Sequence, residues 1–145
     1  MNIFILSVSD QIYSTQRIYK EAFRRGHTVK IINHLKCSIK LSEGKPEIIY
    51  NGENIIDIPD VIIPRIGTSA SRHGAAIVKE FEMNGVFSTA RSLGIIRAQN
   101  KVRTLQILNR KGILSNSFYR LPGSLIRADN NFFDYLNESL LIKTI

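Results

Sequence analysis

The opening of the chain has the spacing of a β-strand, an α-helix and a second β-strand. Compact apolar runs at Asn2–Ser7 and Thr28–Asn33 predict two buried strands. Parallel strands need a crossover connection, and the segment between these runs is long enough for a helix. We expect Ser14 or Thr15 to cap this helix and Gly26 to end it. Its expected inward-facing side chains are Ile18, Ala22 and Phe23.

The loop after the first strand lacks the glycines of a dinucleotide-binding fingerprint. No glycine occurs between Met1 and Gly26. Glycines in that fingerprint allow a tight turn and a close approach of the backbone to the pyrophosphate. The sequence therefore argues against a Rossmann-type cofactor site in the first βαβ unit.

The segment Asp60–Thr68 reads as a further buried strand that ends in polar groups. Three branched apolar residues are followed by a proline, a cation, a glycine and a hydroxyl. Ligands of open α/β sheets bind beyond the carboxyl ends of the strands, so Arg65, Gly67 and Thr68 are candidates for holding a small anionic group. The alternative is that Pro64 ends an edge strand and Arg65 is a solvated surface cation.

Residues 35–58 look like an insertion that contains a small β-hairpin. The apolar runs Ile48–Tyr50 and Asn54–Ile56 flank Asn51 and Gly52, a pair that tolerates the positive φ angles of a tight turn.

After the Asp60–Thr68 segment, the pattern predicts a helix and a fourth strand. We expect the helix to begin near Ser71 and to close near Gly85, and Val86–Ser88 to form the strand. The expected apolar contribution of this helix is Ala75, Ala76, Val78, Phe81 and Met83.

Residues 89–112 show helical periodicity in two pieces. Asn100 is a suitable N-cap for the second piece, and Gly112 is a suitable stop. Lys101 falls in the first turn, where a cation opposes the helix dipole unless an anion lies nearby. Such a local conflict is typical of functional sites, and the alternative is a lysine that points into water.

The C-terminal part predicts short elements and an apolar end. Ser117–Leu121 is a plausible strand, Pro122-Gly123 a turn and 131–137 a short helix. The chain closes on the β-prone run Ser139–Ile145. We expect this run either to pair in a sheet or to belong to something longer.

Composition is that of an ordinary soluble domain with an excess of positive charge. Of the 145 residues, 43% are hydrophobic and 22% charged, and no apolar run approaches the roughly 20 residues that span a bilayer. We therefore expect a cytoplasmic protein without membrane contact.

The single cysteine, Cys37, excludes an intrachain disulfide and a cysteine-based zinc cluster, and is expected to be a packing residue.

The charge balance favours anionic partners without identifying one. Twenty Lys and Arg residues against 12 Asp and Glu residues give a net charge of +8. This excess attracts nucleotides, acidic peptides or RNA. The alternative is a basic surface that serves only solubility.

A family resemblance rests on segments spread over the first 108 residues. They are Ile3–Ser7, Tyr13-Ser14, Arg17, Arg25–His27, Val61–Thr68, Phe81–Met83, Asn100–Arg103 and Gln106–Leu108. Together they resemble the N-terminal part of RimK-type ATP-grasp ligases, ribosomal-protein modification enzymes that attach glutamate to a protein C-terminus. The resemblance is strong over residues 1 to 114 and weak over 115–138.

The resemblance implies a pre-ATP-grasp, Rossmann-like α/β domain over residues 1–114, with a three-layer, mostly parallel sheet, helices on both faces and an inserted hairpin. Residues 115–145 would be a linker and the first strand of a missing or truncated ATP-grasp region. Arg65, Gly67 and Thr68 would face the substrate. Lys143, and with it Lys101, would contact the nucleotide phosphates.

The chain departs from the family pattern where the metal and adenine sites would follow. After Lys143 only Thr144 and Ile145 remain, so we expect no catalytic residue and no metal ligand within these 145 residues. ATP and Mg²⁺ are family expectations. An ATP-grasp domain in cis or in trans, an acidic peptide or amino-acid substrate, and a ribosomal protein would be the partners.

The sequence leaves two other functions open. The chain could be a stand-alone binding module for an acidic peptide or RNA that kept the fold and lost catalysis. It could also be an oligomerisation domain, if the C-terminal strand pairs with another copy of the chain.

Overall fold

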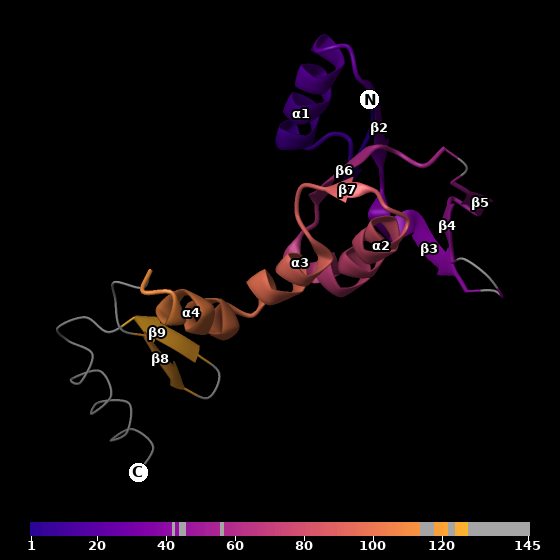
Figure 1. The fold of residues 1–145 in the computed structure, drawn as a ribbon. Helices are drawn as coiled ribbons and strands as arrows, with labels where there is room; N and C mark the ends of the chain where they lie inside the picture. Colours follow the sequence, from indigo (N-terminus) through magenta and orange to yellow (C-terminus); the bar gives the residue numbers. More distant parts are fainter. Residues whose placement is uncertain (42, 44–45, 56, 114–117, 122–123, 128–145) are drawn as a thin grey trace. The chain divides into compact units, whose positions relative to one another are not determined.

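Four parallel strands form the main sheet of the computed structural model, which describes residues 1–41, 43, 46–55, 57–113, 118–121 and 124–127 (Figure 1). They are β1 (Asn2–Ser7), β2 (Thr28–Ile32), β6 (Val61–Arg65) and β7 (Phe87–Ser88), in the order β2-β1-β6-β7. The strands pair in a register that places Ser7 opposite Arg65. The chain divides into two compact units, Met1–Gln99 and Asn100–Ile145, and the sheet belongs to the first.

The two faces of the sheet are covered by different helices, α1 (Tyr13–Arg24) and α2 (Ser71–Met83). Phe4 and Leu6 of β1 lie in one buried cluster with Ile77, Val78 and Phe81 of α2. Ile3 and Ile5 point to the opposite face because side chains alternate along a strand, and they are also buried. On that side α1 contacts β1 and β2. The predicted three-layer α/β fold is confirmed.

Helix α1 begins earlier than expected. Its N-cap is Ile12, and no side chain caps it. Ser14 and Thr15 lie inside the first turn, so the prediction that either is the cap is wrong; their hydroxyls make tertiary hydrogen bonds instead. Gly26 follows the helix with a φ of 79°, as its predicted role as the stop requires.

Three expected core side chains on the helices are exposed. Phe23 of α1 is 65% exposed and stacks on Tyr19, with ring centroids 6.2 Å apart. Met83, the last residue of α2, is 63% exposed. Ala76 also faces outward, while the neighbouring Ile77, not anticipated, is fully buried. Helical periodicity identified the apolar stripe, but its ends and edges extend beyond the strands that it covers.

The insertion forms a three-stranded antiparallel sheet of β3 (Cys37–Lys40), β4 (Glu47–Tyr50) and β5 (Glu53–Asn54), preceded by the 3-10 helix η1 (His34–Lys36). The predicted hairpin turn is confirmed. Asn51 and Gly52 have φ angles of 53° and 90°. Strand β3 was not predicted, and it pairs with β4 from Cys37 opposite Tyr50 to Lys40 opposite Glu47.

The two-piece helical segment consists of α3 (Ser92–Gln99) in the first unit and α4 (Lys101–Arg110) in the second. Asn100 caps α4 as predicted, because its side-chain oxygen accepts from the backbone N–H of Arg103 at 3.0 Å. The second unit also contains the antiparallel pair β8 (Phe118–Leu121) and β9 (Ser124–Arg127). The helix predicted at 131–137 and the run 139–145 lie outside the described residues. The predicted domain boundary at residue 114 stays a prediction.

Candidate functional site

The rim between β1 and β6 is the point at which the strand order reverses. From β1 the chain passes through α1 to β2 on one side, and it later returns to β6 on the other side of β1. In open parallel sheets this arrangement leaves a crevice at the carboxyl ends of the two central strands, where ligands bind. Ser7 and Arg65 are the paired residues at that end.

Arg65 links β6 to the first turn of α1. Its guanidinium donates a hydrogen bond of 2.9 Å to Ser14 Oγ. The side chain is exposed, and a guanidinium has five N–H donors, so several remain for a ligand. The N-terminus of α1 has neither a side-chain cap nor an acidic residue in its first turn. A cation beside the positive end of a helix dipole suits a carboxylate or a phosphate.

Gly67 and Thr68 continue the rim at the start of the 3-10 helix η2 (Thr68–Ala70). Both residues are exposed, and a Cβ added to Gly67 would meet no atom within 4 Å. The carbonyl of Thr68 accepts from Ser71 Oγ at 2.7 Å, which ties the rim to the start of α2. The three residues predicted from the sequence therefore lie together on one exposed edge.

A buried pair of hydroxyls holds the loop between β1 and α1. Ser7 Oγ donates to the carbonyl of Ser9 at 2.9 Å, so in its 3.0 Å contact with Thr15 Oγ1 it accepts. Both side chains have no exposed surface. This pair fixes the turn of α1 that carries Ser14. Sequence reasoning missed the roles of Ser7, Ser14 and Thr15; the only signal was a cluster of hydroxyl residues beside a strand end.

Helix α2 presses closely against the rim at Gly74. A Cβ added to Gly74 would lie 2.6 Å from Cγ2 and 2.7 Å from Cδ1 of Ile66, which is closer than real Cβ atoms approach. Ile66 stands between Arg65 and Gly67. A side chain at position 74 would therefore force Ile66 to shift.

Glu82, part of the segment that carried the family resemblance, has a structural role. Its carboxylate accepts from the backbone N–H of Ser92 at 2.9 Å and from Ser92 Oγ at 2.7 Å. Ser92 is the first residue of α3, so Glu82 satisfies donors at the start of that helix.

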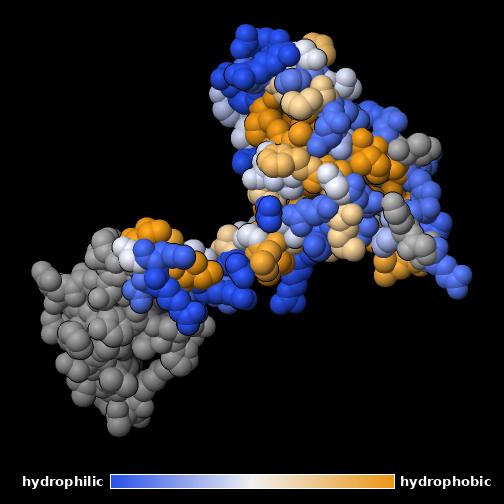
Figure 2. Space-filling model, in the orientation of Figure 1, coloured by the Kyte–Doolittle hydropathy of each residue, from blue (hydrophilic) through white to orange (hydrophobic). Residues whose placement is uncertain are grey.

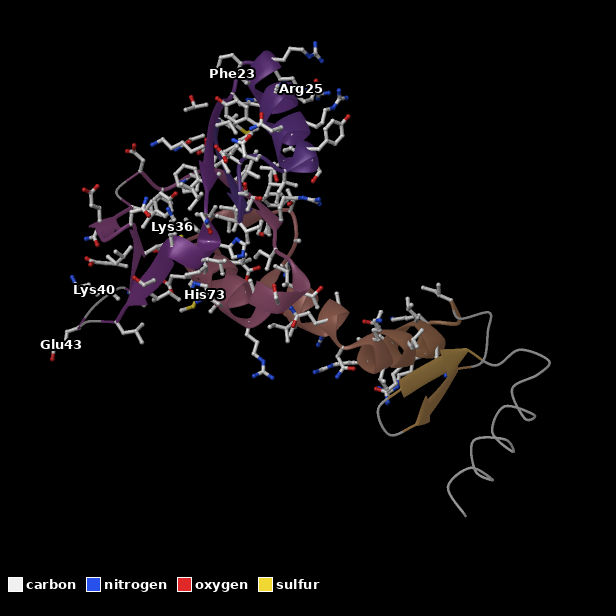
Figure 3. The ribbon with its side chains drawn as sticks, turned by 180° about the vertical axis from the view of Figure 1, so that it is seen from behind. Phe23, Arg25, Lys36, Lys40, Glu43 and His73 are labelled. Carbon is white, nitrogen blue, oxygen red and sulfur yellow. The ribbon has the colours of Figure 1, made fainter. Side chains whose placement is uncertain are left out.

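Two histidines and the cysteine lie where β2 ends. His73 of α2 lies beside β3 (Figure 3), and its Nε2 donates to the carbonyls of His34 and Cys37 at 3.0 and 3.1 Å. His34 is fully buried, and no group in the described part of the chain bonds either of its ring nitrogens. Cys37 is also buried, and burial raises the pKa of its thiol to about 11, as expected for a packing residue.

We expect His34 to make the fold sensitive to mild acid. Burial, and secondly the nearby His73, lower the pKa of His34 below its ordinary value of 6.5. The unfolded chain therefore binds the proton more readily, and the free energy of unfolding falls as the pH drops below about 6.5. Urea unfolding at pH values from about 7.5 to 5.5 measures this loss.

His34→Leu should flatten that pH dependence and cost little at neutral pH, because it removes two unpartnered polar atoms. His27→Leu, in the loop between α1 and β2, is the matched control for replacing a histidine by leucine. A His34→Leu chain that is as acid-sensitive as the parent would contradict the assignment to His34.

The two lysines proposed for phosphate contact do not belong to the unit that carries the rim. Lys101 is exposed in the first turn of α4, a turn without acidic residues, and α4 belongs to the second unit. Lys143 lies outside the described residues. Among the residues that the structure describes, no three His, Cys, Asp or Glu side chains are grouped to hold a metal ion, and no helix could cross a membrane.

Comparison with protein families gives a match over most of this chain. The RimK PreATP-grasp domain matches residues 1–95, which include the whole main sheet and the rim.

Curated relatives of similar sequence are named as glutamate ligases. The chain is 44% identical over 113 residues to a "Probable alpha-L-glutamate ligase" of Aliivibrio fischeri (strain MJ11), and 48% identical over 113 residues to one of Coxiella burnetii (strain Dugway 5J108-111). Each match covers 78% of this chain and 37% of the relative. This chain thus corresponds to little more than a third of the length of those relatives.

A solved structure supports the fold alone. The macrocyclase MdnB from Microcystis aeruginosa MRC superposes with a TM-score of 0.60 at 15% sequence identity. The superposition covers 89% of this chain and 61% of the macrocyclase.

Proposed function

This chain belongs to the RimK pre-ATP-grasp domain family, and on that premise we propose that it is the substrate-side domain of an ATP-dependent glutamate ligase. The ligase would join a carboxylate to an amine, and this chain would need an ATP-grasp domain in cis or in trans. We expect the 145 residues alone to be inactive. The cytoplasmic location stays a prediction.

The observation that supports this proposal is Arg65 at the β1–β6 crevice, bonded to Ser14 of α1. We propose that Arg65 binds a carboxylate of the acidic peptide or amino-acid substrate, and that Gly67 and Thr68 leave room and provide backbone and hydroxyl groups beside it. Charge-assisted hydrogen bonds of this kind are short and strong. Ser14 would keep the guanidinium oriented before the substrate arrives.

The described residues contain no group of three or more His, Cys, Asp or Glu side chains that could hold a metal ion, and we assign no reaction step to them. In the family reaction, ATP phosphorylates a carboxylate and the amine then displaces phosphate from the acyl phosphate. Bound Mg²⁺ would offset the phosphate charge during this transfer. We propose that Lys143 and Lys101 contact the nucleotide phosphates once an ATP-grasp region is present.

A chimaera tests the proposal. Residues 1–113 of this chain would replace the matching part of the Aliivibrio fischeri relative, and mass spectrometry would detect glutamate added to an acidic acceptor peptide. We expect activity from the chimaera and none from the 145-residue chain. An inactive chimaera that is folded and binds ATP would contradict the proposal.

Within the chimaera, Arg65→Ala is expected to lower kcat/KM for the anionic substrate about 10-fold or more. A hydrogen bond to a charged group contributes about 1.5 to 3 kcal/mol, and 1.4 kcal/mol corresponds to a factor of 10. The free energy of unfolding should change by less than about 0.5 kcal/mol, because Arg65 is exposed.

Arg25→Ala is the matched control, since Arg25 lies at the other end of α1 and its side chain forms an exposed ion pair with Glu21 (Figure 3). Its kcat/KM should stay within about twofold of the parent. Equal losses from both substitutions would mean that net charge, and not the rim, binds the substrate.

A further inference from the structure

Strand β2 forms one edge of the main sheet, and in the described part of the chain only β1 pairs with it. The backbone N–H of Thr28 donates to the carbonyl of Met1 at 3.0 Å. Successive residues of a strand turn their main-chain groups to opposite sides, so Lys30 and Ile32 also face β1. The main-chain groups of Val29 and Ile31 therefore face away from the sheet, and no described residue hydrogen-bonds them.

A groove of about 770 Å³ runs along this free edge and reaches residues 7–10 at the end of β1. Five consecutive residues, 29–33, line it. Neighbouring side chains of a strand point to opposite faces of the sheet. Because consecutive residues of β2 all line this groove, the groove lies beside the strand, at the edge of the sheet, and not over one face. Gln16 and Tyr19 of α1 form one wall, and Lys36 and Tyr50 contribute to the other.

The charges at the groove favour an acidic occupant. Lys30 and Lys36 line it, against the single carboxylate of Asp10. Lys30 has a loose partner in Asp57, with Nζ and Oδ2 3.6 Å apart. The described residues give Lys36 no ion pair, and it lies exposed next to β3 (Figure 3).

A second copy of the chain is a poorer occupant of this edge. Antiparallel pairing of β2 with β2 of another copy, centred on the strand, would bring the two Lys30 side chains together. Like charges opposite each other destabilise strand pairs, and lysines on edge strands prevent such pairing. The outer surface of neighbouring α1 is also mostly hydrophilic (Figure 2), which does not favour a dry interface between copies.

We propose that the free edge of β2 binds an extended acidic peptide as an additional strand of the sheet. The peptide backbone hydrogen-bonds the main-chain groups of Val29 and Ile31, and its acidic side chains lie beside Lys30 and Lys36. This mode takes affinity from the main chain and specificity from alternate side chains. The proposed strand addition rests on the proposed function only in taking the peptide to be the ligase substrate. The binding itself needs no ATP.

Hydrogen exchange of the ¹⁵N-labelled 145-residue chain tests the proposal with the probe peptide acetyl-Val-Glu-Thr-Glu-Val-Glu-amide. At saturation, we expect the amides of Val29 and Ile31 to exchange at least 10-fold more slowly. The amides of Lys30 and Ile32 already bond to β1 and should change less than about twofold. Lys36→Glu should weaken binding at least 10-fold, whereas Arg25→Glu should not weaken it.

A charge-matched peptide, acetyl-Pro-Glu-Pro-Glu-Pro-Glu-amide, separates strand addition from charge attraction, because proline cannot donate to a β-ladder. It should bind at least 10-fold more weakly. Equal binding of both peptides would overturn the proposal. So would exchange protection at Val29 and Ile31 that rises with protein concentration without peptide, because a second copy would then occupy the edge.

Amide shifts confined to residues 65–68, with no change at Val29 and Ile31, would also overturn the proposal and place the peptide at the rim. The proposed ligase function would survive each of these results, because the chimaera and Arg65→Ala measure it separately. Loss of chimaera activity with peptide binding intact at β2 would instead remove the ligase function alone.

Discussion

Phe81→Ala is expected to lower the free energy of unfolding by about 4 kcal/mol, within the range found for buried Phe-to-Ala substitutions. Phe81 is fully buried in the cluster between α2 and the main sheet. Its ring meets that of Phe4 edge to face, with centroids 6.3 Å apart and planes at 88°. The substitution removes this contact and leaves a cavity that rigid neighbours cannot fill. Urea unfolding measures the loss.

Phe23→Ala is the matched control for Phe81→Ala. Phe23 is 65% exposed and its ring stacks on Tyr19, so the loss should be below about 1 kcal/mol. If Phe81→Ala does not fold well enough to measure, Phe81→Leu keeps most of the volume and should still destabilise more than Phe23→Leu. Equal losses at the two positions would contradict the described packing of α2.

Gly74→Ala is expected to destabilise the chain by about 2 kcal/mol, although alanine is the better helix former by about 1 kcal/mol. The new Cβ would lie 2.6 Å from Ile66 Cγ2. That atom is attached directly to the Cβ of a branched side chain, so it moves aside only if Ile66 leaves its χ1 rotamer or the backbone of the rim shifts. We also expect weaker binding of anionic substrate by the chimaera, because Arg65 precedes Ile66.

Two further variants separate the contact from the glycine itself. Gly94 lies in α3 with no atom within 4 Å of an added Cβ, so Gly94→Ala should be neutral or stabilise by up to about 1 kcal/mol. In an Ile66→Ala background, Gly74→Ala should lose its penalty. A double-mutant cycle with a coupling energy near zero would show that Ile66 does not set the requirement for glycine.

Local sequence signals predicted the structure correctly where the conformation depends on residues that are neighbours in the sequence. The turn at Asn51-Gly52, the Asn100 cap and the glycine after α1 follow from backbone conformations that few residue types adopt. Strand and helix identities also follow from apolar periodicity. Arg65, Gly67 and Thr68 could be placed at one rim because they are nearly contiguous and follow a buried strand.

Local sequence signals gave wrong predictions where a side chain hydrogen-bonds or packs against a residue that is distant in sequence. Ser14 was read as a cap because hydroxyls commonly serve helix ends, but it bonds Arg65, which is 51 residues away in sequence. Phe23 fits the apolar stripe of α1 yet extends past the strands that the helix covers. Glu82 entered the sequence analysis only as part of a family segment, and its role appears only in the structure, where its carboxylate accepts hydrogen bonds from the start of α3.

The amino-acid order by itself determined an α/β chain of the RimK pre-ATP-grasp type, with a cationic strand end at Arg65. Only the tertiary structure decided which groups meet that strand end, that α2 excludes a side chain at position 74, and that the edge of β2 is open. The physical reason is that propensity and periodicity act over a few residues. Pairing, close packing and a free strand edge depend on segments that come together only when the sheet forms.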